Sequence, residues 1–230
     1  MRLSLLTFVF FASMFLVFPQ QPEAYFDYAI SQHLKSYKEK SEIATKDGDI
    51  AYAQFLFDSL VDNHLKYSQI ADMTLKKVNG GTYKTAKTDN AYLLITKSPW
   101  QPIDTDEIEA INNISKMYKD QVDIIVLFWS TRREAKKLSS DYASTVTVTY
   151  VDEKQNNANH IIKPFKHSFG APACFFISEE KQLINIDKKF TLGFNFDTTI
   201  DVALKETHEQ IKLMLFEDGP TNESIITTLN

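Results

Sequence analysis

The sequence has a single cysteine among 230 residues, and this scarcity limits its chemistry more than any other feature. Cys174 cannot form an internal disulfide, so the burial of an apolar core must stabilise the fold. It can be a buried apolar side chain, an intermolecular bridge or a reactive thiol, and burial is the commonest of the three. A Cys-x-x-Cys redox pair is excluded by the count.

Basic charge is also lacking. The chain carries 25 Lys and Arg against 30 Asp and Glu, a net charge of −5, whereas a nucleic-acid-binding protein usually shows a basic face. The sequence contains no Gly-rich phosphate loop and no Gly-x-Ser-x-Gly. We therefore expect no nucleic-acid partner.

Metal-ligand spacing is missing as well. His160 and His167 lie seven residues apart without a third ligand at a suitable distance. The five histidines are scattered along the chain and are interpreted as solvated surface residues: His33, His64, His160, His167 and His208. We expect no metal and no cofactor.

Long apolar runs are rare, and the one present lies at the N-terminus. Arg2 precedes a mainly apolar stretch from Leu3 to Phe18 that contains no charged residue, and Ala24 is a small residue suited to a cleavage site, although Pro22 is not. No cysteine follows the run, which excludes a lipoprotein-type anchor. Residues 1–24 are predicted to be a signal peptide, with an uncleaved membrane anchor as the alternative. The protein is therefore expected to be exported, to the periplasm or cell envelope.

Residues 25–71 are predicted to form a helical N-terminal segment. Apolar residues recur at spacings of three and four in two stretches, separated by a break at "TKDGD" in which Asp49 is the expected N-cap. The residues expected to face inward are Phe26, Ile30, His33, Leu34 and Tyr37 in the first helix, and Ile50, Ala53, Phe57, Leu60 and Val61 in the second.

From residue 72 to residue 216 the pattern predicts an α/β domain, followed by a flexible tail at 217–230. A Gly-Gly turn at Gly80 indicates a hairpin, and apolar strands are expected at 91–96, 122–129, 146–152, 171–178 and 183–190. Helices are expected at 108–118, 132–142 and 198–216, and a helix kinked or broken before Pro164 at 157–170. This alternation favours layers around a mostly parallel central sheet.

Several short motifs in this domain occur in the order found in one known family. They are Gly80-Gly81-Thr82, Trp100, the helix opening Glu107 to Asn112, the helix exit Tyr118 to Val122, and Gly170-Ala171-Pro172 followed by Cys174 to Ile177. The stretch from Asp72 to Phe190 thereby resembles the redoxin branch of the thioredoxin fold, the TlpA-like exported thiol-disulfide proteins. The resemblance implies a thioredoxin-like central sheet with flanking helices. Glu109 departs from the family, which has proline there.

The larger departure is at the redox motif itself. In this alignment Gln101 and Asp104 hold the positions of the family's two cysteines. A competing alignment sets "FWSTRREAKK" against the motif and would place Arg133 and Lys136 there. The helix opening and the strand order favour the first alignment, and both lack the thiols.

Without thiols the family's chemistry is lost, because it needs a thiolate at a helix N-terminus and a second thiol to resolve the mixed disulfide. Asp104 and Glu107 instead fit a capping box, with Asp106 adding a third carboxylate where the helix dipole favours negative charge. The alternative is a new acid and amide site of Asp104 and Gln101, for which no partner residue can be placed from the sequence.

The resemblance also implies that Pro172 is cis and that a backbone edge beside it can pair with an extended peptide. Trp100, Gln101, Ala171 and Pro172 are thus predicted to form a peptide-binding face, unless Trp100 and Pro172 only hold the fold. The leading hypothesis is an exported, redox-inactive module that binds an unidentified protein or peptide. The first alternative is a thiol-disulfide oxidoreductase that uses Cys174 alone with an external resolving thiol. The second is a structural subunit whose N-terminal helices make the interaction.

Overall fold

A computed structural model describes residues 25–101, 104–155, 158–188 and 200–216. The predicted signal segment 1–24 and the predicted tail 217–230 lie outside these residues, as do the end of the strand expected at 183–190 and the first two residues of the helix expected at 198–216. None of the described helices has the length and apolar character that a bilayer span requires.

The described strands form one seven-stranded sheet in the order β2-β1-β5-β4-β3-β6-β7. Their bounds are β1 Thr74–Lys77, β2 Thr82–Lys84, β3 Ala91–Lys97, β4 Val122–Phe128, β5 Val146–Tyr150, β6 Ala173–Ile177 and β7 Leu183–Asp187. Only β3, β4 and β5 are mutually parallel, so the prediction of a mostly parallel sheet is wrong. The four other strands pair antiparallel: short turns join β1 to β2 and β6 to β7, and such turns cannot make the crossover that parallel strands need.

The described helices agree with most of the predicted ranges. They are α2 Phe26–Lys46, α3 Ile50–Leu60, α4 Thr105–Met117, α5 Arg132–Leu138, α6 Asn159–Ile161 and α7 Ile200–Phe216, with π-helical turns η2 Val61–Leu65 and η4 Ile162–His167 and a short 3-10 turn η3 Thr85–Lys87. Asp49 is the N-cap of α3, as predicted, and accepts a hydrogen bond from the Tyr52 amide at 2.9 Å.

The helix around Pro164 was expected to kink or break before the proline. The α-helical part does end there, at Ile161, but the segment continues through Pro164 as the π-helical η4. Proline lacks an amide hydrogen and its ring clashes with the preceding turn of an α-helix, which disfavours regular α-helix at this point.

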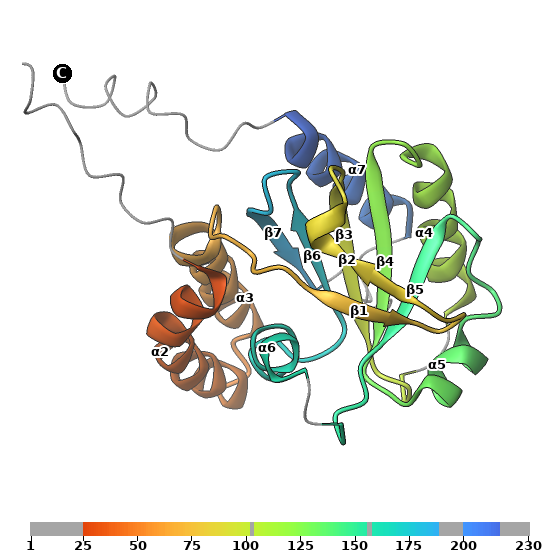
Figure 1. The fold of residues 1–230 in the computed structure, drawn as a ribbon. Helices are drawn as coiled ribbons and strands as arrows, with labels where there is room; N and C mark the ends of the chain where they lie inside the picture. The colour runs from red at the N-terminus through yellow and green to blue at the C-terminus, as the bar shows by residue number, and fades with distance from the viewer. Residues whose placement is uncertain (1–24, 102–103, 156–157, 189–199, 217–230) are drawn as a thin grey trace, which may run out of the picture.

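The central strands are buried on both faces because each face has its own helical layer. Leu93, Ile95 and Cys174 lie in one core with residues of α4 and α7. Leu94 and Phe175 lie in the other core, with α2, α3 and the α6–η4 segment, which Figure 1 shows together on one side of the sheet. On that side four phenylalanine rings pack at centroid distances of 5.0–6.3 Å, and they hold α2 and η4 to β6: Phe26, Phe165, Phe169 and Phe175.

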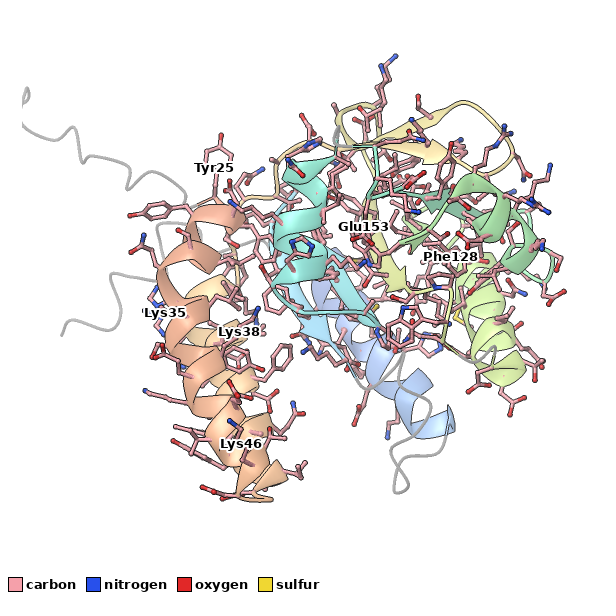
Figure 2. All side chains as sticks on the ribbon, turned by 90° about the horizontal axis from the view of Figure 1, so that it is seen from below. Tyr25, Lys35, Lys38, Lys46, Phe128 and Glu153 are labelled. Atoms are coloured by element: carbon pink, nitrogen blue, oxygen red, sulfur yellow. The ribbon has the colours of Figure 1, made fainter. Side chains whose placement is uncertain are left out.

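The N-terminal hairpin α2–α3 is packed on the domain at one end and projects from it at the other. Phe26 and Ile30 near its base are buried, as are Phe57 and Leu60. Ile50, which was expected to face inward, is 65% exposed. It begins α3 at the loop of the hairpin, and Figure 2 shows this end, marked by Lys46, lying farthest from the sheet.

Candidate functional site

The candidate site lies where β3 and β6 meet at one end of the sheet. Thr96 near the end of β3 pairs with Ala173 at the start of β6, and the Ala171–Pro172 peptide bond is cis. The turn after β3 and the cis proline therefore leave the sheet at the same end of neighbouring strands.

This pairing helps to choose between the two alignments of the redox motif, one with Gln101 and Asp104 at the cysteine positions and the other with Arg133 and Lys136. The cis-proline strand β6 pairs with β3 and not with β4, so the junction of β3 and α4 is the one beside the proline. Arg133 and Lys136 lie exposed on α5, which follows β4. The geometry favours the alignment that sets Gln101 and Asp104 at the cysteine positions.

The four residues predicted to bind a peptide differ in exposure. Trp100 is 77% exposed, Gln101 and Ala171 are half-buried, and Pro172 is buried. Within the described part of the chain, neither the N–H nor the C=O of Ala171 has a backbone hydrogen-bond partner. The surface thus offers one exposed aromatic ring and one half-buried peptide unit, while the proline ring belongs to the interior.

Gln101 and Asp104 are both engaged in closing local structure. The Gln101 amide donates to the Ser98 carbonyl at 3.2 Å, and the Gln101 side-chain oxygen accepts from the Ser98 amide at 2.8 Å. Asp104 accepts from the amides of Asp106 and Glu107 at 3.0 and 3.2 Å, so the predicted N-cap of α4 is confirmed. Neither side chain is placed as a nucleophile.

Glu107 does not complete the predicted capping box. Instead of reaching back to the cap, its carboxylate accepts a hydrogen bond from the ammonium group of Lys97 at 2.6 Å. The two side chains are 6% and 8% exposed, so the ion pair is buried beneath the turn that carries Trp100 and Gln101. A complete capping box occurs elsewhere, between Thr131 and Glu134 of α5.

The environment of this ion pair penalises the charge on Glu107. Burial raises the pKa of the carboxyl group, Lys97 opposes the shift, and the nearby Asp104 carboxylate adds to it. The second carboxylate oxygen, Oε1, is buried and has no hydrogen-bond partner among the described residues. Tyr142 lies close enough for Glu107 to contribute, after burial, to raising the pKa of the phenol.

Lys97 is the functional-site residue that sequence reasoning missed. It ends a strand whose seven residues are all buried. Lysine is almost never fully buried unless it is paired, so a lysine at the end of such a run indicates a hidden carboxylate partner. That signal was present in "AYLLITK".

Cys174 is fully buried in the middle of β6, as expected from its apolar neighbours. Burial raises the pKa of its thiol well above the ordinary range, and the carboxylates of Asp187 and Glu107 act in the same direction. A thiol in this environment is neither ionised nor accessible, and a thiol must be both to act as a nucleophile.

Two of the five histidines are not scattered, contrary to expectation. His33 of α2 and His64 of η2 stack with ring centroids 3.8 Å apart, and burial followed by the charge of His33 lowers the pKa of His64. Among the described residues, no group of three or more His, Cys, Asp or Glu side chains is arranged to hold a metal ion.

No family model matches the sequence, and no curated protein matches it. Solved structures do match. A protein described as the thiol:disulfide interchange protein DsbE of Chlorobium tepidum is 18% identical, with a TM-score of 0.50 over 65% of this chain and 97% of that one.

Two further solved structures are less similar, and both have TM-scores of 0.46. A secreted disulfide oxidoreductase of Mycobacterium tuberculosis is 12% identical over 61% of this chain and 94% of its own. The exposed lipoprotein thioredoxin Etrx1 of Streptococcus pneumoniae is 16% identical over 60% of this chain and 99% of its own. The match to the Chlorobium protein shows the fold alone, and with the mixed sheet and the cis proline beside β3 it confirms that this chain has a thioredoxin-like fold.

Proposed function

We propose that this chain is an exported, redox-inactive thioredoxin-like protein that binds a protein or peptide partner through Trp100, Gln101, Ala171 and Pro172. The observation that carries the proposal is the 77% exposure of Trp100, a large aromatic side chain on a turn in which the Gln101 side chain accepts a hydrogen bond from the Ser98 amide. The export part of the proposal rests on the apolar run from Leu3 to Phe18 that follows Arg2.

The positions of the side chains support the proposed absence of redox activity. The chain has one cysteine, and that thiol is buried with a raised pKa. At the two positions that the alignment assigns to thiols, Gln101 closes a turn and Asp104 caps a helix. Disulfide exchange needs an accessible thiolate, and none of these groups supplies one.

The residues exposed at the surface support the proposed binding role. An exposed tryptophan is unusual on a soluble protein outside an interface, and tryptophan is among the residues that contribute most to binding energy. The peptide unit of Ala171, which has no described backbone partner, can add hydrogen bonds to an extended segment. Gln101 is half-buried beside this surface, and Pro172, which is buried, would contribute to it through its backbone next to Ala171.

The test is selection from a random peptide library displayed on phage, with the wild-type chain and Trp100→Ala as parallel baits. We expect the wild-type chain to enrich a common sequence pattern, and Trp100→Ala to bind the enriched peptides at least about tenfold more weakly, as is typical for the loss of a central aromatic contact. Met117→Ala is the matched control, because Met117 is 66% exposed on α4 outside the site.

Two results would contradict the proposal. One is equal binding of the enriched peptides by the wild-type chain and Trp100→Ala. The other is reduction of a disulfide substrate by the wild-type chain that is lost in Cys174→Ser, which would revive the oxidoreductase.

A further inference from the structure

Helix α3 is apolar around most of its circumference. Its sequence, "IAYAQFLFDSL", has eight apolar residues out of eleven. Phe57 and Leu60 face the domain and are buried, which accounts for one side of the helix. A surface helix normally has a polar outer face, and a helix that is apolar all round is normally buried. On the outer side of α3, the hydrogen-bonded pair Gln54 and Asp58 is accompanied by exposed apolar residues, among them Tyr52 and Phe55.

Four exposed apolar residues lie towards the free end of the hairpin, and two others, Tyr25 and Tyr28, lie at its base. Ile43 lies near the end of α2, and Ile50, Tyr52 and Phe55 lie in the first turns of α3; we call these four residues the tip patch. They are 61%, 65%, 46% and 62% exposed, respectively. The rings of Tyr52 and Phe55 stack on each other with centroids 6.2 Å apart. Figure 2 shows this end of the hairpin, near Lys46, projecting away from the rest of the protein.

The exposed area of the tip patch is comparable to that of apolar patches that are often functional. Four large side chains at roughly half to two-thirds exposure present on the order of 500 Å². The largest apolar patch on a typical monomer covers about 300–600 Å² and is often functional. Two such patches facing each other would bury about 1,000 Å², close to the lower limit for a specific interface.

The charges around the tip patch favour a second copy of this chain over a lipid surface. Glu42 and Lys46 form an ion pair at 2.8 Å, and Asp47 and Asp49 lie in the loop. This rim carries both signs, so a two-fold arrangement can set the lysine of one copy near an acidic residue of the other. Its acidic excess opposes binding to an anionic membrane.

We propose that the tip patch is the centre of a homodimer interface in which the hairpins of two copies pack into a four-helix arrangement. An apolar surface is complementary to itself, as a two-fold interface requires, and short antiparallel helix pairs commonly pack in fours. The face around Trp100 takes no part in this contact, so the homodimer does not depend on the peptide-binding proposal.

The test is the molar mass in solution, measured by light scattering from about 1 to about 100 μM on the full chain in the form that the cell exports. We expect the wild-type chain to shift from monomer to dimer within this range. The double variant Ile50→Gln with Phe55→Gln should weaken the dimer at least about tenfold. Met117→Gln, an equally exposed apolar site on α4, should leave it unchanged.

A second measurement uses the buried state of Cys174, which leaves no reactive thiol in the background. Ile50→Cys should form an intermolecular disulfide under mild oxidation, whereas Met117→Cys should not. A chain that stays monomeric at all these concentrations overturns the proposal, as does a dimer that the double variant leaves intact. Binding of a monomeric chain to phosphatidylglycerol vesicles, lost in the double variant, would assign the patch to a lipid surface instead.

Discussion

The buried ion pair beneath the candidate site makes a quantitative prediction. Among the residues that the structure describes, replacing Lys97 with Met leaves neither oxygen of the buried Glu107 carboxylate paired, because Oε1 already has no partner there. Removing one member of a buried pair typically costs about 3–5 kcal/mol of the free energy of unfolding. Proton uptake by Glu107 limits the loss, since burial already raises its pKa. We therefore expect Lys97→Met to cost about 3 kcal/mol at pH 7.

The double variant separates the charge from the packing. Lys97→Met with Glu107→Leu replaces both charges by apolar groups, and such exchanges are often neutral or stabilising. The double variant should recover most of the loss, giving a coupling energy of about 2–3 kcal/mol in a double-mutant cycle. The control is Lys212→Met, which breaks the exposed pair with Glu209 on α7 and should change stability by no more than about 0.5 kcal/mol.

Equilibrium unfolding in urea gives the free energies, with the fluorescence of the buried Trp129 as a probe of the folded state. A cost below about 1 kcal/mol for Lys97→Met would refute the reasoning, because it would mean that water reaches and solvates Glu107. A double variant as unstable as the single variant would also refute it, by showing that packing of the lysine stem, and not its charge, supplies the stability.

Two further predictions concern titration and reactivity. Burial raises the pKa of Glu107 in the folded chain, so the folded chain holds this proton more tightly than the unfolded chain does. The free energy of unfolding of the wild-type chain, compared with that of Glu107→Gln, should therefore be greatest below about pH 4. It should fall as the pH rises through the raised pKa. Urea unfolding of both chains from about pH 4 to pH 8 measures this difference, and a difference that grows with pH would show that Lys97 outweighs burial. Cys174 should react with a thiol reagent only after denaturation, because it is fully buried and its pKa is raised; rapid labelling of the native chain would contradict the buried position and restore a thiol mechanism.

The positions of most helices and strands could be predicted because local patterns determine them. The apolar run of β4 and the Asp49 cap of α3 each depend on a few consecutive residues. The directions of the strands were less accessible. Whether β1 joins β5 antiparallel depends on contacts between Lys76 and Tyr150, which are far apart in the sequence, and no local period reports such a pairing.

The candidate site was predictable in its position but not in its internal contacts. Motif order placed Gln101 and Asp104 at the junction of β3 and α4, and the roles of both in local hydrogen bonding follow from short-range geometry. The choice of Glu107 between its own helix cap and Lys97 could not be predicted, because it depends on how closely the end of β3 approaches the first turn of α4. A glutamate three residues after the N-cap, as Glu107 is after Asp104, has the same sequence pattern whether it completes a capping box or is buried against a lysine.

The contacts within the site support the proposed binding role over catalysis. A catalytic group must exchange protons or bonds with a substrate, whereas the side-chain oxygen of Gln101 closes a turn, Asp104 caps a helix and Glu107 is paired with Lys97. The Lys97–Glu107 pair ties the end of β3 to the first turn of α4, the two elements that flank the turn carrying Trp100. A rigid turn loses little conformational entropy when a partner binds, so the exposed ring of Trp100 is presented in the way that favours recognition.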